Sequence, residues 1–255
     1  RVTPALRTLI QGAADLEQRS GGHFNAGIGG LVQTWGFHDD ILRPGARPSA
    51  RRLARWRDAR PSLRQLQWQG LNLRSGNPRL QLDFGGYAKG VAADWALDRL
   101  QAAGAHAALV NLGGNLATQG RPGARAWQVG IRDPAGGGLL AQLASDGREA
   151  IVTSGSYERF RVLDGQACCH LIDPESGQAV HELVSATVAH PDAGVADAAA
   201  SALMVAGPRR WPAVAAALGL DQVLVVHRSG LAEVTPRLAA RLLPSADWRS
   251  ALRVI

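Results

Sequence analysis

The sequence contains very little lysine and very little sulfur. Of its 28 basic residues 27 are arginine, and Lys89 is the one lysine in 255 residues. There are two cysteines, Cys168 and Cys169, which are neighbours. Adjacent cysteines form a disulfide only with strain, and their spacing does not suit a metal site. The two thiols therefore neither require nor exclude an oxidising compartment.

Long apolar runs are also missing. No stretch of 18 apolar residues occurs, which excludes a transmembrane helix at the sequence level. The hydrophobic fraction of 46% and the charged fraction of 19% are typical of a globular protein with a substantial core. The first residues, "RVTPALRTLI", have no initiator methionine and no signal-peptide pattern, so we expect the chain to start within a longer protein.

Acidic residues are outnumbered, and the net charge is +7. The densest basic stretch is residues 47–64. Such a charge favours an anionic partner, for example a nucleic acid, a membrane surface or a phosphorylated ligand. The simpler interpretation is an exposed basic helix on an arginine-rich surface. No groove-entering or stacking motif is present, so we expect no nucleic-acid partner.

Apolar spacing predicts helices over 4–19, 86–104 and 194–207, the last closed by Gly207, with basic helices in 41–66. Alternation around "SGNP" predicts a hairpin within 66–86. Further strands are predicted in the segments 106–112, 126–132, 151–155, 157–163, 168–172, 184–190 and 221–227. Strands outnumber helices and do not alternate with them regularly. The fold class predicted is therefore α+β rather than a doubly wound sheet.

Four glycine-bearing stretches recur, at 83–90, 111–115, 153–160 and 170–177. Glycine lets backbone N–H groups approach a ligand, and a lysine beside such a turn can place a point charge on a phosphate. Each stretch alone is weak support for a ligand site, because most glycine turns only redirect the chain. Neither a P-loop nor a GxGxxG pattern occurs.

Two residue pairs can each be interpreted either as functional groups, in metal binding or catalysis, or as structural groups. Asp197 and Ser201 share a helix face, so they could hold Mg²⁺, or Asp197 could cap its helix and Ser201 could pack as a small residue. His170 could act as a general base. Asp173 could assist it or brace the turn that it begins. The residues alone leave these alternatives open.

Taken together and in order, the stretches "FNAGIGGLVQTWGF", "DFGGYAKG", "LGGN", "TSGSYERF…HLIDPESG" and "ADAAASAL" resemble the motifs of the ApbE family of flavin transferases. The matches run from about residue 20 to residue 207. Five motifs in a kept order are far more specific than any one of them. Asn25 stands where the family has aspartate, and Ser176 and Ser201 stand where it has threonine, with the hydroxyl kept.

The resemblance implies one ApbE-like domain over 1–255, with largely antiparallel mixed sheets, packed helices and a T-fold-like core. It implies Mg²⁺-dependent cleavage of FAD, transfer of FMN to a threonine hydroxyl of an acceptor protein, and release of AMP. His170 and Asp173 would be catalytic. Metal ligands would be Gly86 through its carbonyl, Asp197 and Ser201. The flavin contacts implied are His23, Phe24, Asn25, Asp83, Lys89, Gly113, Gly114, Asn115, Ser154, Gly155 and Ile172.

The family usually has some tens of residues before the first helix of this chain, so we expect a missing N-terminal segment. The resemblance also implies the periplasm or the outside of the cell envelope, with membrane association through a lipoprotein segment. Two other activities fit the same residues. One is an FAD pyrophosphatase with water as acceptor, and the other is a flavin-binding homologue without catalysis.

Overall fold

The computed structural model describes residues 1–248 and 251–255. Its α-helices are α1 (Pro4–Arg19), α2 (Gly29–Thr34), α3 (Ala50–Ala59), α4 (Ala88–Ala102), α5 (Ala193–Leu218) and α6 (Pro236–Ala239). Its strands are β1 (Leu66–Gln69), β2 (Asn72–Ser75), β3 (Ala108–Leu112), β4 (Asn115–Gln119), β5 (Trp127–Arg132), β6 (Leu139–Ser145), β7 (Glu149–Gly155), β8 (Phe160–Leu163), β9 (Gln166–Cys169), β10 (Leu183–His190), β11 (Val223–His227), β12 (Ala232–Val234), β13 (Leu242–Pro244) and β14 (Leu252–Val254).

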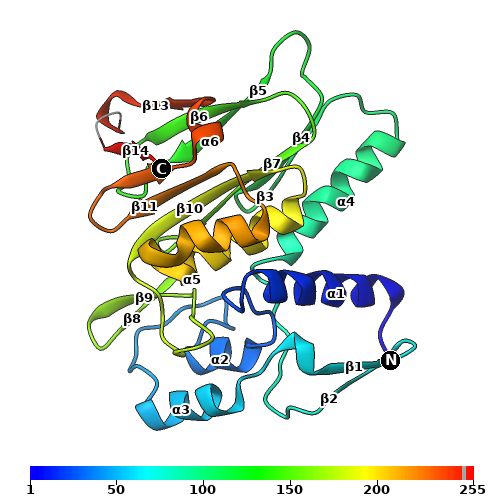
Figure 1. The fold of residues 1–255 in the computed structure, drawn as a ribbon, viewed down its shortest axis with the longest axis vertical. Coiled ribbons are helices and arrows are strands. Elements are labelled where there is room, and N and C mark those ends of the chain that lie inside the picture. Colours follow the sequence, from blue (N-terminus) through cyan, green and yellow to red (C-terminus); the bar gives the residue numbers. More distant parts are fainter. Residues whose placement is uncertain (249–250) are drawn as a thin grey trace.

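A seven-stranded sheet runs through the middle of the molecule in the order β14-β12-β11-β10-β7-β4-β3 (Figure 1). Its strands pair antiparallel except for β12 and β14, which are parallel. A three-stranded antiparallel sheet has the order β13-β6-β5, and β1-β2 and β8-β9 form separate hairpins. This mixture of helices with largely antiparallel sheets confirms the α+β prediction.

Both faces of the large sheet are covered, and β11 shows why its sequence is a continuous apolar run. Val223 and Val225 point into the core under α5, whereas Leu224 and Val226 point into a second core shared with the three-stranded sheet. Successive side chains of a strand alternate between faces, so a strand covered on both sides needs apolar residues at every position. The large sheet is therefore the middle layer between α5 and the small sheet.

Helix α5 is rich in alanine because it lies against β7 and β10 at close range. Its residues 196, 198–200 and 202 are alanines with at most 1% of their surface exposed. The backbone leaves the helical conformation at Gly207, with φ of 70°, and the helical element continues after Pro208 to Leu218. The predicted end at Gly207 is therefore a break within a longer element. A glycine there permits the left-handed φ that interrupts the helix.

Helix α1 begins and ends where the sequence predicted. The hydroxyl of Thr3 accepts a hydrogen bond from Leu6 N, and Pro4 occupies the first helical position. Helix α3 is the exposed basic helix, with only Leu53 fully buried. Within residues 1–248 and 251–255, no helix is long and apolar enough to cross a membrane.

Two local predictions were wrong. The hairpin at 66–86 turns at Gly70 and Leu71, where Gly70 adopts a φ of 61°, and "SGNP" follows its second strand instead of forming the turn. Strands β4, β6, β12, β13 and β14 were not predicted, and β6 directly follows the segment that was read as a glycine-rich turn. Strand β5 precedes that segment in the chain and β6 follows it. The two strands pair with each other, and this pairing makes β6 a strand.

Candidate functional site

A cavity of about 820 Å³ lies where five of the sequence motifs meet. That volume is in the range of small-molecule and cofactor sites. Its walls come from the segment before and within α2, the turn into α4, the β3-β4 turn, the end of β7, the segment after β9, and α5. Residues as far apart in the sequence as His23 and Val205 therefore line one space.

The structure brings together 15 of the 16 site residues expected from the sequence. The lining includes His23, Phe24, Asn25, Asp83, Gly86, Lys89, Gly113, Gly114, Asn115, Ser154, Gly155, His170, Ile172, Asp197 and Ser201. Asp173 is the exception. Its two carboxylate oxygens accept hydrogen bonds from Glu175 N, Ser176 N and the Ser176 hydroxyl, at 3.0, 3.3 and 2.6 Å. This geometry favours the turn-bracing interpretation of Asp173 over the catalytic one.

Lys89 and Asp197 meet at the base of the cavity. The Lys89 ammonium lies 3.5 Å from Asp197 Oδ2 and donates to the Gly85 carbonyl at 2.5 Å. The Asp197 side chain is only 3% exposed, whereas that of Lys89 is 42% exposed. Burial raises the pKa of Asp197, and the charge of Lys89 opposes that rise. A cation thus faces the cavity with a buried carboxylate beneath it.

Oxygen atoms gather beside this pair. The Ser201 hydroxyl lies 3.2 Å from the Ser154 hydroxyl. Gly86 is so close to Ser201 that a Cβ atom at Gly86 would stand 3.0 Å from the Ser201 hydroxyl. One turn before Ser201 on α5 is Asp197. Because Gly86 has no side chain, its backbone can lie close to Ser201.

The donor set suits a hard cation. Among the described residues, no group of three or more His, Cys, Asp or Glu side chains could hold a metal ion, so a zinc-type cluster is absent from them. What this corner offers is the Asp197 carboxylate, the hydroxyls of Ser154 and Ser201, and the Gly86 backbone beside them. Mg²⁺ is usually held by one or two carboxylates together with water and substrate phosphates. Asp197, Ser201 and Gly86 therefore fit Mg²⁺.

The β3-β4 turn contributes backbone and amide donors. Gly113 and Gly114 both have positive φ, at 60° and 92°, and Gly114 N donates to the Asn111 side chain at 2.9 Å. The side chain of Asn115 is buried in the cavity wall. Its Nδ2 atom makes no close hydrogen bond among residues 1–248 and 251–255, although the amide lies near enough to Asp197 to lower the pKa of that carboxyl. A buried donor without a close partner is costly, so this amide is suited to a ligand oxygen.

His170 is oriented as a base. Its Nδ1 lies 3.0 Å from the Arg159 carbonyl, which can only accept, so Nδ1 carries the proton. Nε2 is therefore the nitrogen that can accept a proton. Burial is the largest cause that lowers the pKa of His170, and the positive charges of Arg159 and Lys89 lower it further. The imidazole is consequently neutral near physiological pH.

Some predicted contacts are partly used within the protein. Asn25 donates to the Pro61 carbonyl and accepts from Gly27 N, so its amide braces its own loop while it lines the cavity. Asp83 accepts from Gly85 N and thereby shapes the turn that leads to Lys89. Their geometry is compatible with indirect support of a ligand through the loops they hold.

The sequence did not single out the other charged wall of the cavity. Arg132 forms an ion pair with Glu158 at 3.2 Å, and both line the cavity together with Tyr157 and Arg159. The last three belong to the quoted stretch "TSGSYERF", which could have indicated them. Arg132 comes from β5 in the small sheet, and no local pattern links it to the motif.

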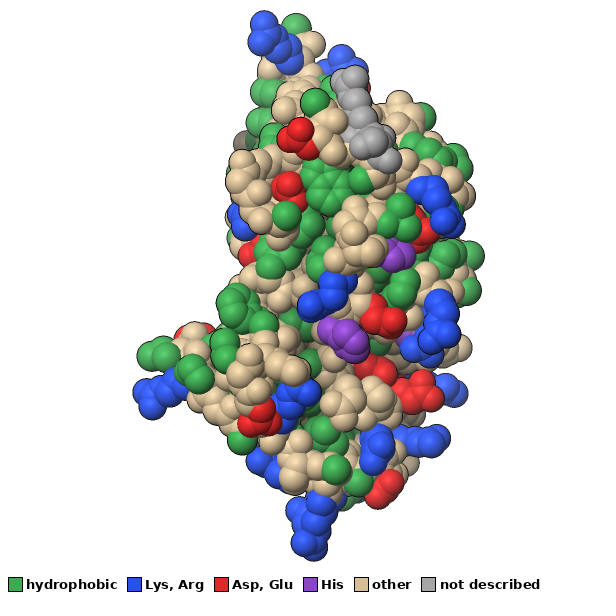
Figure 2. Space-filling model, turned by 90° about the vertical axis from the view of Figure 1, so that its left-hand side faces the viewer, with side chains coloured by type: hydrophobic (Ala, Val, Ile, Leu, Met, Phe, Trp, Pro, Cys, Tyr) green, Lys and Arg blue, Asp and Glu red, His purple; other side chains and the backbone are tan. Residues whose placement is uncertain are grey.

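The basic helix α3 is separate from this cavity. None of its arginines lines the cavity, although the segment before it contributes Ile28, Val32 and Phe37. In Figure 2, basic side chains project at both ends of the molecule, whereas in its middle basic side chains lie beside histidine and acidic ones, and the cavity lining holds Lys89, Arg132 and Arg159 against Asp83, Glu158 and Asp197. The net positive charge is thus borne largely outside the candidate site.

Comparison with known proteins connects this geometry to one family. The model of the ApbE family matches residues 1–224. An FAD:protein FMN transferase of Rhodobacter capsulatus is 40% identical over 241 residues, covering 94% of this chain and 46% of that protein. The FAD:protein FMN transferase of Escherichia coli K12 is 31% identical, covering 88% of this chain and 65% of that one. The chain spans less than two thirds of either relative.

Solved structures show the same fold. The ApbE protein of Thermotoga maritima superposes with a TM-score of 0.86 at 24% identity, covering 94% of this chain and 79% of that one. The apo form of the Pseudomonas stutzeri flavinyl transferase ApbE superposes with a TM-score of 0.79 at 30% identity, covering 94% and 75%. Both superpositions include nearly the whole chain, and therefore the cavity.

Proposed function

The chain belongs to the ApbE family, and on that basis we propose that it transfers FMN from FAD to a threonine hydroxyl of an acceptor protein and releases AMP. The observation that carries the proposal is a single cavity that is lined by the Lys89 ammonium, an oxygen donor set around Asp197, and a His170 imidazole whose Nδ1 is held by the Arg159 carbonyl. Phosphoryl-type transfer requires mainly positioning and charge, and these residues supply both.

The step balances without further reactants. The acceptor oxygen attacks the phosphorus of the FMN half, and the bond from that phosphorus to the bridging oxygen breaks. The bridging oxygen leaves with AMP, and His170 Nε2 takes the proton of the acceptor hydroxyl. Lys89 stabilises negative charge on the pyrophosphate, and Asn115 Nδ2 is suited to donate to one of its oxygens.

A divalent cation belongs to the same proposal. Bound Mg²⁺ would neutralise charge on the pyrophosphate oxygens. Asp197, Ser201 and the Gly86 carbonyl would hold it. In the present geometry Lys89 lies against Asp197, so the ammonium would have to turn toward the phosphates to make room. The half-exposed side chain of Lys89 has the freedom to do so.

The test uses purified protein with FAD, Mg²⁺ and an acceptor whose flavinylation segment contains a threonine. We expect intact-mass spectrometry to show addition of FMN to the acceptor. An acceptor with that threonine replaced by valine is the matched control and should remain unmodified. Release of free FMN and AMP in the absence of acceptor would instead indicate a pyrophosphatase. Bound FAD with no product in either reaction would indicate a flavin-binding protein without catalysis.

The cellular location forms a separate proposal. By its family we place the protein in the periplasm or at the exterior of the cell envelope. Cell fractionation of the source organism followed by immunodetection tests this directly. Recovery of the protein only with cytoplasmic markers would contradict it, without any bearing on the chemistry.

A further inference from the structure

Helices α4 and α5 are joined at two places one turn apart. At the cavity, Asp197 of α5 accepts from Gly90 N at 3.2 Å. One turn further along α4, Asp94 accepts from Ala193 N and Gly194 N at 2.8 and 3.2 Å. The order of these contacts means that the helices run in opposite directions. Each helix thus receives, at its first turn, a carboxylate from the other helix, where free N–H groups and the helix dipole favour it.

The helices touch between these two contacts. A Cβ atom at Gly90 would lie 2.1 Å from the Ala193 carbonyl oxygen and 2.8 Å from the Gly194 Cα. Backbones this close allow little sliding without collision. A shift of α4 along α5 would break both carboxylate contacts together.

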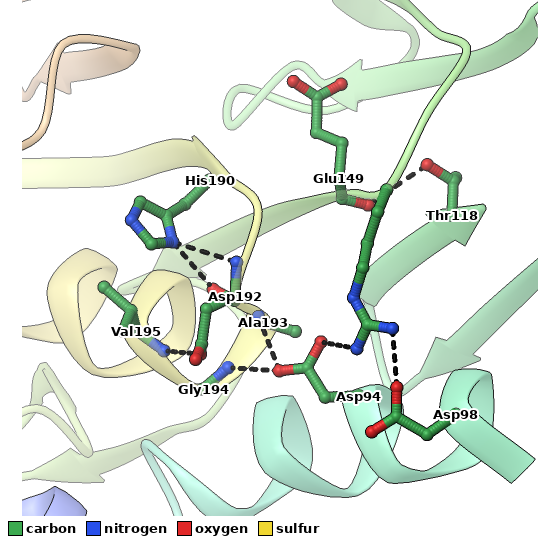
Figure 3. Close-up of polar contacts among 10 residues, drawn as sticks. Asp94, Asp98, Thr118, Glu149, His190, Asp192, Ala193, Gly194 and Val195 are labelled. Atoms are coloured by element: carbon green, nitrogen blue, oxygen red, sulfur yellow. Dashed lines mark hydrogen bonds and ion pairs between the residues drawn. The ribbon is translucent and has the colours of Figure 1, made fainter. Parts of the chain in front are cut away.

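Asp94 is itself held by a cation. Arg148 Nη2 lies 3.4 Å from Asp94, and Arg148 Nη1 lies 2.6 Å from Asp98 (Figure 3). The Asp94 side chain is 15% exposed. Burial and the nearby charge of Asp192 raise the pKa of Asp94, and the hydrogen bonds from α5 and the charge of Arg148 oppose the rise. Arg148 precedes β7, whose far end carries Ser154 in the cavity.

We propose that Asp94 is a positioning residue, which fixes the register of α4 on α5 and thereby keeps Lys89 aligned with Asp197 in the cavity. This inference rests on the proposed function for its effect on FAD. Asp94 touches no ligand, and it acts through the backbone of the first turn of α5. If its hydrogen bonds are lost, the α4 segment that carries Lys89 and Gly90 keeps its packing at Gly90 and its contacts with Asp197 but loses the second polar link to α5.

Asp192 offers a matched control. It also caps α5, because its carboxylate accepts from Val195 N at 2.7 Å (Figure 3), but it belongs to the segment that leads into α5, and within the described part of the chain its side chain makes no hydrogen bond to α4. Asp94→Ala and Asp192→Ala both remove a cap from the same helix end. Only the first removes the link between the two helices.

The experiment compares these variants in three measurements: melting temperature, FAD affinity by fluorescence titration, and hydrogen exchange of residues 84–92. Both alanine variants should lower the melting temperature. Only Asp94→Ala should weaken FAD binding, by about tenfold, and accelerate exchange in 84–92. Asp94→Asn keeps an oxygen that can accept from α5, so it should restore most of the affinity.

A double-substitution cycle separates positioning from general damage. In an Asp197→Ala background the contacts of Asp197 with Lys89 and with Gly90 N are already lost, so adding Asp94→Ala should change FAD affinity by less than about twofold. The proposal is overturned if the full tenfold loss persists in that background, or if Asp192→Ala weakens binding as much as Asp94→Ala does.

Hydrogen exchange distinguishes a failure of the proposed function from a failure of the positioning role of Asp94. If the unaltered protein bound no FAD, the proposed function would fail, but exchange in 84–92 would still decide the role of Asp94. Unchanged exchange in Asp94→Ala would overturn the positioning role even if FAD transfer were demonstrated. Should Asp94→Ala not fold, Arg148→Gln removes only the ion pair and should show the same pattern at smaller size. An Arg148→Gln protein with unaltered exchange and affinity would contradict the proposal.

Discussion

The two ends of the α4–α5 pairing are built from the same parts but face different surroundings. Each end has an aspartate from one helix, N–H groups from the first turn of the other, and a basic side chain beside the aspartate. One end lies away from the cavity, at Asp94, and we call it the closed end. The basic residue there is Arg148, which contacts both Asp94 and Asp98. At the cavity end it is Lys89, the one lysine of the chain.

Under the proposed function, this difference gives a reason for a lysine at position 89 of an arginine-rich sequence. A guanidinium is a planar fork that binds two carboxylates at once, which suits the closed end, where Asp94 and Asp98 lie together. An ammonium is a compact charge on a slim stem, and it can turn from Asp197 to a ligand phosphate. Arg148 therefore holds two aspartates together at the closed end, whereas Lys89 places in the cavity a charge that can change its partner.

The largest effect is expected at the carboxylate of the cavity end. Asp197→Asn should lower FMN transfer by at least about a hundredfold, because the carboxylate that would hold the divalent cation is lost. Burial raises the folded-state pKa of Asp197 above its unfolded value, so its ionisation costs stability as pH rises through that folded pKa. At neutral pH the variant should therefore melt at the same temperature or higher. Activity at the original level would contradict the assigned role.

The two ends of the α4–α5 pairing also differ in the role we expect for the histidine that lies near each of them. His170 lines the cavity, whereas His190 accepts from Asp192 N at the closed end (Figure 3). His170→Gln should lower the turnover rate by about a hundredfold, and His190→Gln should leave it unchanged. Because burial depresses the pKa of His170, the acid limb of the wild-type rate profile should have its midpoint below 6.5. A midpoint at or above 6.5 would argue against His170 as the base.

Gly90 connects the two ends, and an added methyl group there should disturb both. A Cβ would stand 2.1 Å from a backbone oxygen of α5, which cannot yield as a flexible side chain would. Gly90→Ala should therefore lower the free energy of unfolding by about 2 kcal/mol, measured by chemical denaturation. As a control, Gly104→Ala changes a glycine at the end of α4 with open space around it, where only its positive φ opposes a side chain. Equal losses in the two variants would show that the helix contact is not the cause.

The substitutions Lys89→Arg and Arg148→Lys, which swap one basic residue type for the other, should have the smallest and most selective effects. Lys89→Arg should weaken FAD binding by about tenfold, because the broad guanidinium has little room beside the Gly85 and Gly86 backbone. Arg148→Lys should leave FAD affinity nearly unchanged and lower stability by less than about 1 kcal/mol. Titration with FAD and thermal melting compare the two proteins directly. An unchanged affinity in Lys89→Arg would mean that any cation is accepted at the cavity end.

The sequence predicted the cavity end far better than the closed end. Lys89, Asp197 and Ser201 lie in motifs whose residues are adjacent or one turn apart, so local pattern and family resemblance were enough to find them. Asp94 was only a polar position on another face of the predicted helix. Its role depends on how α4 crosses α5, which is set by the Gly90 contact and by a helix about 100 residues later in the chain.

Long-range pairing also accounts for several of the other misses. Arg132 reaches the cavity from the small sheet, and β6 becomes a strand because β5 pairs with it across a glycine-rich segment. The hairpin turn formed at Gly70 rather than at "SGNP", since the register of Leu66 with Ser75 fixes a two-residue turn. Each outcome was decided by a partner strand and not by local propensity.

The central claim is that the pyrophosphate of FAD binds at the cavity end of the α4–α5 pairing. A crystal structure of the protein with FAD and Mg²⁺ tests it most directly. The account predicts pyrophosphate oxygens within hydrogen-bonding distance of Lys89 Nζ and Asn115 Nδ2, with Asp197 Oδ2 no longer paired to Lys89. A pyrophosphate bound instead along the Arg132–Glu158 wall, with the Lys89–Asp197 pair intact, would contradict it.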